Sequence, residues 1–282
     1  MVGGKESVST IHVKLGYDSA LKRARTMWEN QKEIPILPML ANKWEDRHKY
    51  ISEPFYVQPK IDGVRLLVSN KGGISRTGKI VPGTEHLGKG LREGEYLDGE
   101  CYDPNKTFEE ITSLFKTNPK ALEFHVFDYF DTNQPDLTFD QRLERVTVET
   151  RWVKTKSDLP IVHKQYMDAG YEGTMIREAS SVYEIGKRSN YLLKLKDFKT
   201  DEYKVIGMRE CTGKDIGTPT WVCVTENGQE FTVRPEGTRE KRREMFKNGD
   251  KYIGKMLTVK YQNLTELGVP RFPVGIAFRD YE

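Results

Sequence analysis

The sequence predicts an α+β protein of two domains, in which a larger mixed domain is followed by a small β-barrel. Its 282 residues are enough for one large or two modest domains. Helical and strand-like segments are mixed up to about residue 198, and beyond it short strand-like segments with a single helix predominate. Hydrophobic residues at 37% and aromatic residues at 11% provide the material for a core in each part.

The first part is expected to contain helices and strands in alternation. Apolar residues at helical spacing predict helices over 17–32, 107–117 and 138–150. The proline-broken segment 34–44 is expected to be extended, and 166–178 reads as a helix end, a turn and a strand. Strands rich in β-branched, aromatic or alternating apolar residues are predicted at 55–58, 64–69, 73–76, 123–130 and 189–198.

The second part is expected to be a Greek-key barrel of the OB type. A single helix is predicted over 237–249, and five strand-like runs surround it: 201–210, 220–226, 229–235, 255–262 and 274–280. Several short strands with one helix in so short a stretch fit such a barrel. We therefore place the domains at 1–198 and 199–282.

Composition limits the class of protein. The chain has 45 basic and 42 acidic residues, so its net charge of +3 neither requires nor excludes a polyanionic partner. Three scattered cysteines are too few for a disulfide framework and favour a reducing compartment. No run approaches the roughly 18 apolar residues of a membrane span, and the start lacks the apolar core of a signal peptide. We expect a soluble protein inside a cell, in the cytoplasm of a bacterium or virus-infected host or associated with a nucleus, and no membrane partner.

Lys60 opens the most informative stretch, "QPKIDGVRLLVSN" (58–70). Asp62-Gly63 is a common turn signal, which would make Lys60 an ordinary solvated neighbour. Alternatively, Lys60 is a nucleophile: a lysine amine, with a reference pKa of about 10.4, loses its proton more readily beside a cation such as Arg65 or a metal, or when desolvated. Its product with a nucleotide would be a phosphoramide. This stretch alone leaves both interpretations open.

Acidic and aromatic residues beside glycines form a second group of candidates. Asp98 and Glu100 flank a glycine in "YLDGECYD", and Glu172 precedes Gly173 in "GYEGTMIR". Each acid alone is most often solvated at a turn, but two such acids can hold a divalent metal or a sugar hydroxyl. Phe127 in "FDYF" either packs in a core or stacks on a base.

Three further cations stand near predicted strands. Arg76 lies in "SRTG" at a hairpin edge. Lys194 and Lys196 alternate in "LLKLKDF", so a strand would place both on one face. That face is either solvated or able to bring two ammonium groups to one phosphate.

The order of these short motifs resembles the covalent nucleotidyltransferase superfamily. The order is Lys-x-Asp-Gly-x-Arg, Ser-Arg-x-Gly, Asp-Gly-Glu, aromatic-Asp, Glu-Gly-x-Met and Lys-x-Lys. More closely, the chain is similar to minimal ATP-dependent DNA ligases of the viral type. The resemblance begins at "PMLANKW" (38–44), reaches "PRFPVGIAFRD" (270–280) and so covers nearly the whole chain. It implies a nucleotidyltransferase (adenylation) domain of antiparallel sheets and helices, followed by an OB-fold β-barrel.

The resemblance also implies roles for individual residues. Lys60 would take AMP from ATP, Glu100 and Glu172 would bind Mg²⁺ or Mn²⁺, and the pair Lys194 and Lys196 would complete the catalytic set at the α-phosphate. Phe127 would stack on adenine, Gln58 would sense the adenine edge, and Glu100 would alternatively serve the ribose. Arg65 and Arg76 would contact phosphates of the nucleotide or of the DNA. The complete ATP-binding set implied is Gln58, Lys60, Ile61, Arg65, Arg76, Glu100, Phe127, Glu172, Lys194 and Lys196.

The implied activity is sealing of 3′-hydroxyl/5′-phosphate nicks in duplex DNA by a monomer with no obligate protein partner. Arg271 and Arg279 are the tail candidates for orienting pyrophosphate. Larger ligases have a separate N-terminal DNA-binding domain, for which we expect no room here. Where some viral ligases insert a basic latch, the matching stretch 210–228 is short and hardly basic. We therefore expect DNA to be held by the two domains and by patches such as 238–247.

Three alternatives stay open at this point. An RNA ligase shares the lysine motif and the chemistry. An mRNA capping guanylyltransferase uses a Lys-x-Asp-Gly nucleophile with GTP. A non-catalytic nucleic-acid-binding protein with an OB module would form no covalent adduct. The sequence leaves the role in replication, repair or recombination undecided.

Overall fold

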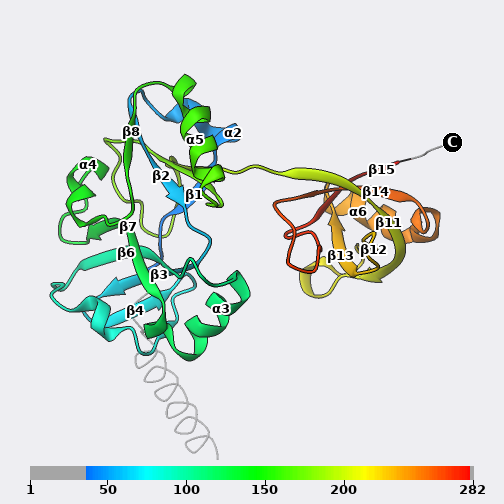
Figure 1. The fold of residues 1–282 in the computed structure, drawn as a ribbon, viewed down its shortest axis with the longest axis horizontal. Helices are drawn as coiled ribbons and strands as arrows, with labels where there is room; N and C mark the ends of the chain where they lie inside the picture. The colour runs from blue at the N-terminus through cyan, green and yellow to red at the C-terminus, as the bar shows by residue number, and fades with distance from the viewer. Residues whose placement is uncertain (1–35, 280–282) are drawn as a thin grey trace, which may run out of the picture. The chain divides into compact units, whose positions relative to one another are not determined.

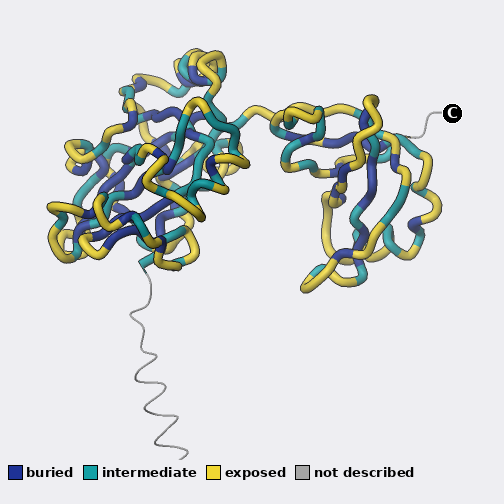
Figure 2. Tube along the Cα trace, turned by 60° about the horizontal axis from the view of Figure 1, so that its bottom comes forward, coloured by how far each residue is buried: buried dark blue, intermediate teal, exposed yellow. Residues whose placement is uncertain are grey.

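The computed structural model describes residues 36–279, so the helix predicted over 17–32 lies outside the described residues. The described chain forms two compact units that divide between Leu195 and Lys196. Buried segments follow the strands of each unit (Figure 2). The fold is mixed α+β, as predicted, and each unit is described by itself.

The first unit is built on two five-stranded sheets (Figure 1). One has the order β1-β10-β9-β2-β8 and the other β5-β4-β3-β6-β7. All pairings are antiparallel except that of β1 with β10, which is parallel. The strands are β1 (Leu40–Lys43), β2 (Phe55–Lys60), β3 (Val64–Ser69), β4 (Gly72–Ser75), β5 (Ile80–Val81), β6 (Glu95–Tyr102), β7 (Glu123–Asp131), β8 (Arg151–Val153), β9 (Gly173–Arg177) and β10 (Arg188–Leu195).

Short helices lie between these strands. Helix α3 begins with a capping box, in which the Thr107 side chain accepts from the Glu110 backbone N–H and the Glu110 side chain accepts from the Thr107 backbone N–H. The α-helices are α2 (Trp44–Arg47), α3 (Phe108–Thr117), α4 (Phe139–Arg142) and α5 (Leu159–Asp168). The 3₁₀ helices are η1 (His48–Tyr50), η2 (Glu85–Gly88), η3 (Pro119–Ala121), η4 (Leu143–Arg145) and η5 (Lys156–Asp158).

The two sheets share a core. Leu67 and Phe130, from the second sheet, pack with Leu192, from the first, and with Met39 and Tyr183. Alternation along β2 then decides which side chains face the shared side, because successive residues of a strand point to opposite faces. Phe55 and Val57 enter the cluster on the other face of the first sheet. Gln58 and Lys60 therefore lie on the face of the first sheet that looks toward the second.

Two predicted elements are shorter in the structure. The helix predicted over 138–150 ends at Arg142, followed only by η4, because the backbone N–H groups of Thr147 and Val148 both donate to the carbonyl of Val126 on β7. The strand predicted over 189–198 ends at Leu195. The expectation that Lys196 continues the strand face of Lys194 is therefore wrong.

The second unit is a closed five-stranded barrel, as predicted for the OB type. Its strand order is β11-β12-β13-β15-β14, and buried Trp221, Val233 and Leu257 are among its core residues. Met245 of α6 packs against that core. The elements are β11 (Lys199–Glu210), η6 (Gly213–Asp215), β12 (Pro219–Val224), β13 (Glu230–Pro235), α6 (Arg239–Lys247), η7 (Gly249–Tyr252), β14 (Met256–Tyr261) and β15 (Val274–Arg279).

Candidate active site

Lys60 and Glu172 form an ion pair at the end of β2. Antiparallel pairing places Lys60 opposite Gly173, and the backbone N–H of Glu172 donates to the Lys60 carbonyl over 2.9 Å. The Lys60 ammonium contacts a Glu172 carboxylate oxygen. The Lys60 side chain is 23% exposed and that of Glu172 only 5%. The candidate nucleophile is thus reachable from solvent while its acidic partner is buried.

Glu100 lies across from this pair on the second sheet. It is the antiparallel neighbour of Arg65, which follows the Lys-x-Asp-Gly turn. Gly63 lets that turn approach, since a β-carbon there would stand 2.4 Å from the Cys101 carbonyl oxygen and 2.8 Å from Cγ of Glu100. Only a residue without a side chain fits at such distances.

The Glu100 carboxyl is buried among charges of both signs. Burial is the main cause that raises the pKa of Glu100 from 4.5 to about 7, and the charges of Asp98 and Glu172 raise it further. The positive charges of Lys60 and Arg65 lower this pKa but do not offset the rise. A further cation beside Glu100 would stabilise the ionised form of its carboxyl group. Glu100 and Glu172 are therefore the two acids of the described site that suit a divalent metal.

The raised pKa of Glu100 predicts a pH dependence of stability. In the nucleotide- and metal-free protein the folded state keeps its proton up to about pH 7, whereas the unfolded chain loses it near 4.5. The folded state binds more protons in this window, so the Glu100 contribution to stability falls as pH rises through it. Glu100→Gln should remove that fall, measured as the difference between wild-type and variant melting temperatures at about pH 5 and about pH 8. An unchanged difference across these pH values would contradict the prediction.

Arg65 is fixed by an acid that the sequence suggested as a metal ligand. Its Nε donates to Asp98 over 2.8 Å, and a second guanidinium nitrogen donates to the other carboxylate oxygen. The Tyr183 hydroxyl also donates to Asp98, which is fully buried. Asp98 is thus occupied by Arg65 and Tyr183, which leaves Glu100 and Glu172 as the metal candidates.

Phe127 occupies a β-bulge. The β6–β7 register runs from Asp98↔Asp128 directly to Gly99↔Val126, so Phe127 has no partner on β6. A bulge of this kind re-aims a side chain and frees backbone groups. The Arg65 guanidinium carbon lies 5.2 Å from the centre of the Phe127 ring.

Gln58 ties this bulge to the strand of Lys60. Its Nε2 donates to the freed Phe127 carbonyl and to Thr150 Oγ1, each over 3.0 Å. Its Oε1 accepts from Arg177 Nε over 2.7 Å. Gln58 is 1% exposed, so its amide connects β2, β7 and β9 from a buried position.

A buried ionic network that the motifs did not suggest supports this arrangement. Asp128 is fully buried and accepts from Arg142 Nε over 2.8 Å and from a guanidinium nitrogen of Arg177. Burial opposes ionisation of Asp128, but the two arginines outweigh it and hold its pKa below the ordinary value. Asp128 stands in the quoted "FDYF" stretch, yet nothing in sequence spacing pairs it with arginines 14 and 49 residues away.

The remaining ATP-site candidates belong to several different elements of the chain. Ile61 is buried beside Lys60. Lys194 pairs with Met175 of β9 in the register of the first sheet, and Met175 packs in the core shared with the second sheet. Lys196 belongs to the second unit, where its Nζ donates to Gln262 over 3.1 Å. Arg76 is exposed in the turn after β4, and within residues 36–279 no ion pair or hydrogen bond of its side chain is seen.

The two tail candidates differ in their surroundings. Arg279 on β15 donates from Nε to Glu202 over 3.0 Å and to Thr258 over 2.8 Å. The Arg271 guanidinium lies over the Phe272 ring at 5.0 Å. Arg279 is therefore held by hydrogen bonds to neighbouring strands of the barrel. Arg271 lies in the loop between β14 and β15.

The residues present fit a divalent cation of the Mg²⁺ kind. Over the described chain, no three His, Cys, Asp or Glu side chains are arranged to hold a metal by themselves. Mg²⁺ is commonly bound by one or two carboxylates together with substrate phosphates and water. Glu100 and Glu172 supply two such carboxylates near Lys60.

Comparisons with known proteins match this chain to DNA ligases. A family model described as "ATP dependent DNA ligase domain" matches residues 38–196, and one described as "DNA ligase OB-like domain" matches 218–279. DNA ligases of African swine fever virus are 28% identical (strain Badajoz 1971 Vero-adapted) and 30% identical (isolate Warthog/Namibia/Wart80/1980), over 99% of this chain and 78% of each relative.

Solved structures show the same fold. The chain is similar to the Chlorella virus DNA ligase-adenylate, with a TM-score of 0.51 at 26% identity, over 88% of this chain and 99% of that one. A structure from a study of Lig E DNA ligases has a TM-score of 0.71 at 22% identity, over 86% of this chain and 99% of that one.

The fold, the lysine–carboxylate site and these matches define a nucleotidyltransferase with an OB domain. The chain belongs to the ATP-dependent DNA ligase family. It is an enzyme that uses ATP and acts on DNA. Within the described residues, no helix is long and apolar enough to cross a membrane.

Proposed function

We propose that this ligase seals 3′-hydroxyl/5′-phosphate nicks through a lysyl-AMP formed on Lys60. The contact between the Lys60 ammonium and the buried Glu172 carboxylate, on the face that looks toward Glu100, carries this proposal. A partly exposed amine beside acids and cations suits attack on a polyanionic nucleotide.

In the first step Lys60 loses a proton and its Nζ attacks the α-phosphorus of ATP. A P–N bond forms, the bond to the bridging oxygen breaks, and pyrophosphate leaves. Because Glu172 is proposed as a metal ligand, the proton of Nζ passes to solvent, to which the Lys60 side chain is 23% exposed. AMP then passes to the 5′-phosphate of the DNA, which restores the free amine. The 3′-hydroxyl finally attacks that 5′-phosphorus, so that a phosphodiester forms and AMP leaves.

The other site residues orient and neutralise the reactants. Phe127 stacks on adenine, while Gln58 fixes the bulge that holds it. Arg65, held by Asp98, and the exposed Arg76 contact phosphates of the nucleotide or of the DNA. Glu100 and Glu172 would hold Mg²⁺ or Mn²⁺, which when bound neutralises charge developing on phosphate oxygens. Prepositioned cations matter because phosphoryl transfer depends chiefly on positioning and electrostatics.

Lys194→Ala is expected to slow lysyl-AMP formation by about 10²–10³-fold, because a fixed cation at the developing phosphate charge is lost. Its place on β10, paired with Met175 on the face toward the second sheet, supports this role. The rate is measured as mass gain in single-turnover reactions with ATP. The exposed Lys120, changed to alanine, is the control and should keep the wild-type rate. A wild-type rate in Lys194→Ala would remove Lys194 from the reaction.

The proposed activity is tested with nicked duplexes that differ at one position. A duplex with a 5′-phosphate at the nick should be sealed in the presence of ATP, and one with a 5′-hydroxyl should not. Preferential sealing of an all-RNA nick would instead favour the RNA ligase alternative. We propose that the enzyme acts as a monomer inside the cell, where ATP and DNA are both present, in replication, repair or recombination.

A further inference from the structure

Tyr183 connects the segment between β9 and β10 to the buried acid Asp98. It is only 7% exposed. Its hydroxyl donates to Asp98 Oδ2 over 2.5 Å and accepts from the backbone N–H of Met39 over 3.0 Å. Because a backbone N–H can only donate, the hydroxyl proton points to Asp98. Burial, and then the charge of Asp98, raise the pKa of Tyr183 well above its ordinary value, so the hydroxyl stays a donor at neutral pH.

The ring of Tyr183 is fixed by stacking in the core that the two sheets of the first unit share. It lies on the ring of Phe130 from β7, with ring centres 4.1 Å apart and an angle of 18° between the planes. Phe130 stacks in turn on Tyr96 of β6, with ring centres 4.8 Å apart. The hydroxyl of Tyr183 therefore reaches Asp98 from a fixed direction.

Asp98 contacts both Tyr183 and Arg65 through the same carboxylate oxygen. Oδ2 accepts from the Tyr183 hydroxyl and from a guanidinium nitrogen of Arg65, and Oδ1 accepts from Arg65 Nε over 2.8 Å. Such a two-point contact sets the plane of the guanidinium as well as its position. Asp98 is completely buried, whereas the Arg65 side chain is 17% exposed. Among residues 36–279 the remaining N–H groups of Arg65 have no hydrogen-bond partner, so they can meet a phosphate.

We propose that Tyr183 is a positioning residue for the phosphate-contacting Arg65 and that it acts through Asp98. Without the hydroxyl, Asp98 and Arg65 would keep their mutual contact but could turn together about the bonds of the Asp98 side chain. Phosphoryl transfer depends chiefly on groups that are in place before the reaction, so this freedom should slow it. The inference rests on the proposed function, which assigns Arg65 to phosphates of the nucleotide or of the DNA.

Tyr129 provides a matched comparison within the same unit. It is 6% exposed, and its hydroxyl donates over 3.1 Å to Glu95, which is also a buried acid of β6. Glu95 contacts Arg92, whose side chain is 80% exposed. Tyr129→Phe thus removes the same kind of buried hydrogen bond as Tyr183→Phe, but one that is not connected to Arg65.

The test is a double-mutant cycle on two single-turnover rates, that of lysyl-AMP formation and that of sealing a pre-adenylated nick. Tyr183→Phe should slow whichever step Arg65→Ala slows, by about 10-fold or more, because a small misplacement of a reacting or neutralising group is costly. In the Arg65→Ala background, Tyr183→Phe should change that rate by less than about 2-fold, since its effect passes through Arg65. Tyr129→Phe should keep the wild-type rates. Melting temperatures are measured for all variants, and rates are compared below the unfolding range of each.

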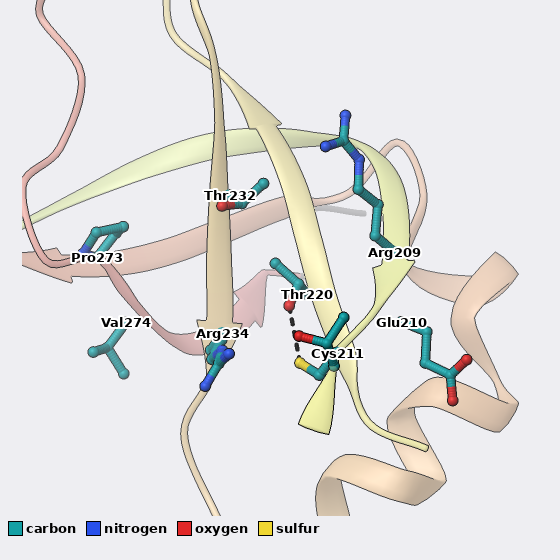
Figure 3. Close-up of a pocket in the computed structure, with 9 residues that line it drawn as sticks. Arg209, Glu210, Cys211, Thr220, Thr232, Arg234, Pro273 and Val274 are labelled. Atoms are coloured by element: carbon teal, nitrogen blue, oxygen red, sulfur yellow. Dashed lines mark hydrogen bonds between the residues drawn. The ribbon is translucent and has the colours of Figure 1, made fainter. Parts of the chain in front are cut away.

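A second control removes an arginine of the second unit. Arg209 lines a hollow of about 470 Å³ on the barrel, and Figure 3 shows it among the side chains of that hollow. Arg209→Ala should form the ATP adduct at the wild-type rate when DNA is absent. A slow Arg65→Ala then reports the position of the lost charge and not merely the loss of one positive charge.

Wild-type rates of Tyr183→Phe in both steps would overturn the inference. The same fold slowing in the wild-type and Arg65→Ala backgrounds, or in Tyr129→Phe, would also overturn it, because the hydroxyl would then act on the fold as a whole. Wild-type rates of Arg65→Ala would do so too, since Tyr183 would have nothing to position. A wild-type enzyme that forms no adduct and seals no nick would instead overturn the proposed function, on which this inference depends.

Discussion

Lys60→Ala should abolish formation of the covalent AMP adduct while leaving measurable sealing of a nick that already carries AMP on its 5′-phosphate. The reason is that Lys60 supplies the nucleophile of the first step only, whereas the last step uses the 3′-hydroxyl of the DNA. The adduct is measured by intact mass after incubation with ATP, and sealing by gel analysis of the pre-adenylated duplex.

Two controls sharpen this result. Lys60→Arg keeps a cation beside Glu172 but cannot deprotonate, so it should also lack the adduct. A circular dichroism spectrum equal to that of the wild type shows that each variant is folded. Normal folding with loss of both adduct formation and pre-adenylated sealing would contradict a role confined to nucleophilic attack.

Asp128→Asn should lower the free energy of unfolding by about 3–5 kcal/mol, the range for breaking a buried ion pair from one side. The substitution leaves Arg142 and Arg177 charged in the interior, since arginine stays protonated there. The effect is measured by urea unfolding followed by circular dichroism.

An exposed pair provides the matched comparison. Glu149 contacts Arg151 with both side chains well exposed, so Glu149→Gln should change stability by less than about 1 kcal/mol. Equal effects of the two substitutions would contradict the view that the Asp128 network holds the strands of Gln58 and Phe127 together.

The local pattern of the sequence predicted elements whose own residues determine them. The α3 helix was predicted over 107–117 from apolar residues at helical spacing, and the structure has it at Phe108–Thr117. The β3 strand follows from its apolar run over 64–69, and the barrel from regularly spaced short strands. In each case the information lies within a few consecutive residues.

Long-range contacts explain the errors. Nothing in the pattern of 138–150 shows that Thr147 and Val148 bond to the Val126 carbonyl and so end the helix early. The pairing of Asp98 with Arg65 and Tyr183, up to 85 residues away, likewise decides that this acid is a support and not an available metal ligand. Such choices depend on which strands become neighbours.

The sequence motifs predicted only part of the candidate site. Lys60 contacts Glu172 in the structure, and both residues influence the pKa of Glu100. The bulge at Phe127 was not predictable, because it arises from a register shift between β6 and β7. The Gln58–Arg177–Asp128 connection was missed for the same reason.

The central claim, that Lys60 takes AMP from ATP, is tested most directly by the intact mass of the purified protein. The protein is first treated with pyrophosphate to remove any AMP already attached, and then incubated with Mg²⁺ and either ATP or GTP in the absence of DNA. We expect a mass gain of one AMP with ATP alone, mapped to Lys60 by peptide analysis. A GMP adduct, an adduct on another residue, or no adduct with ATP would contradict the claim.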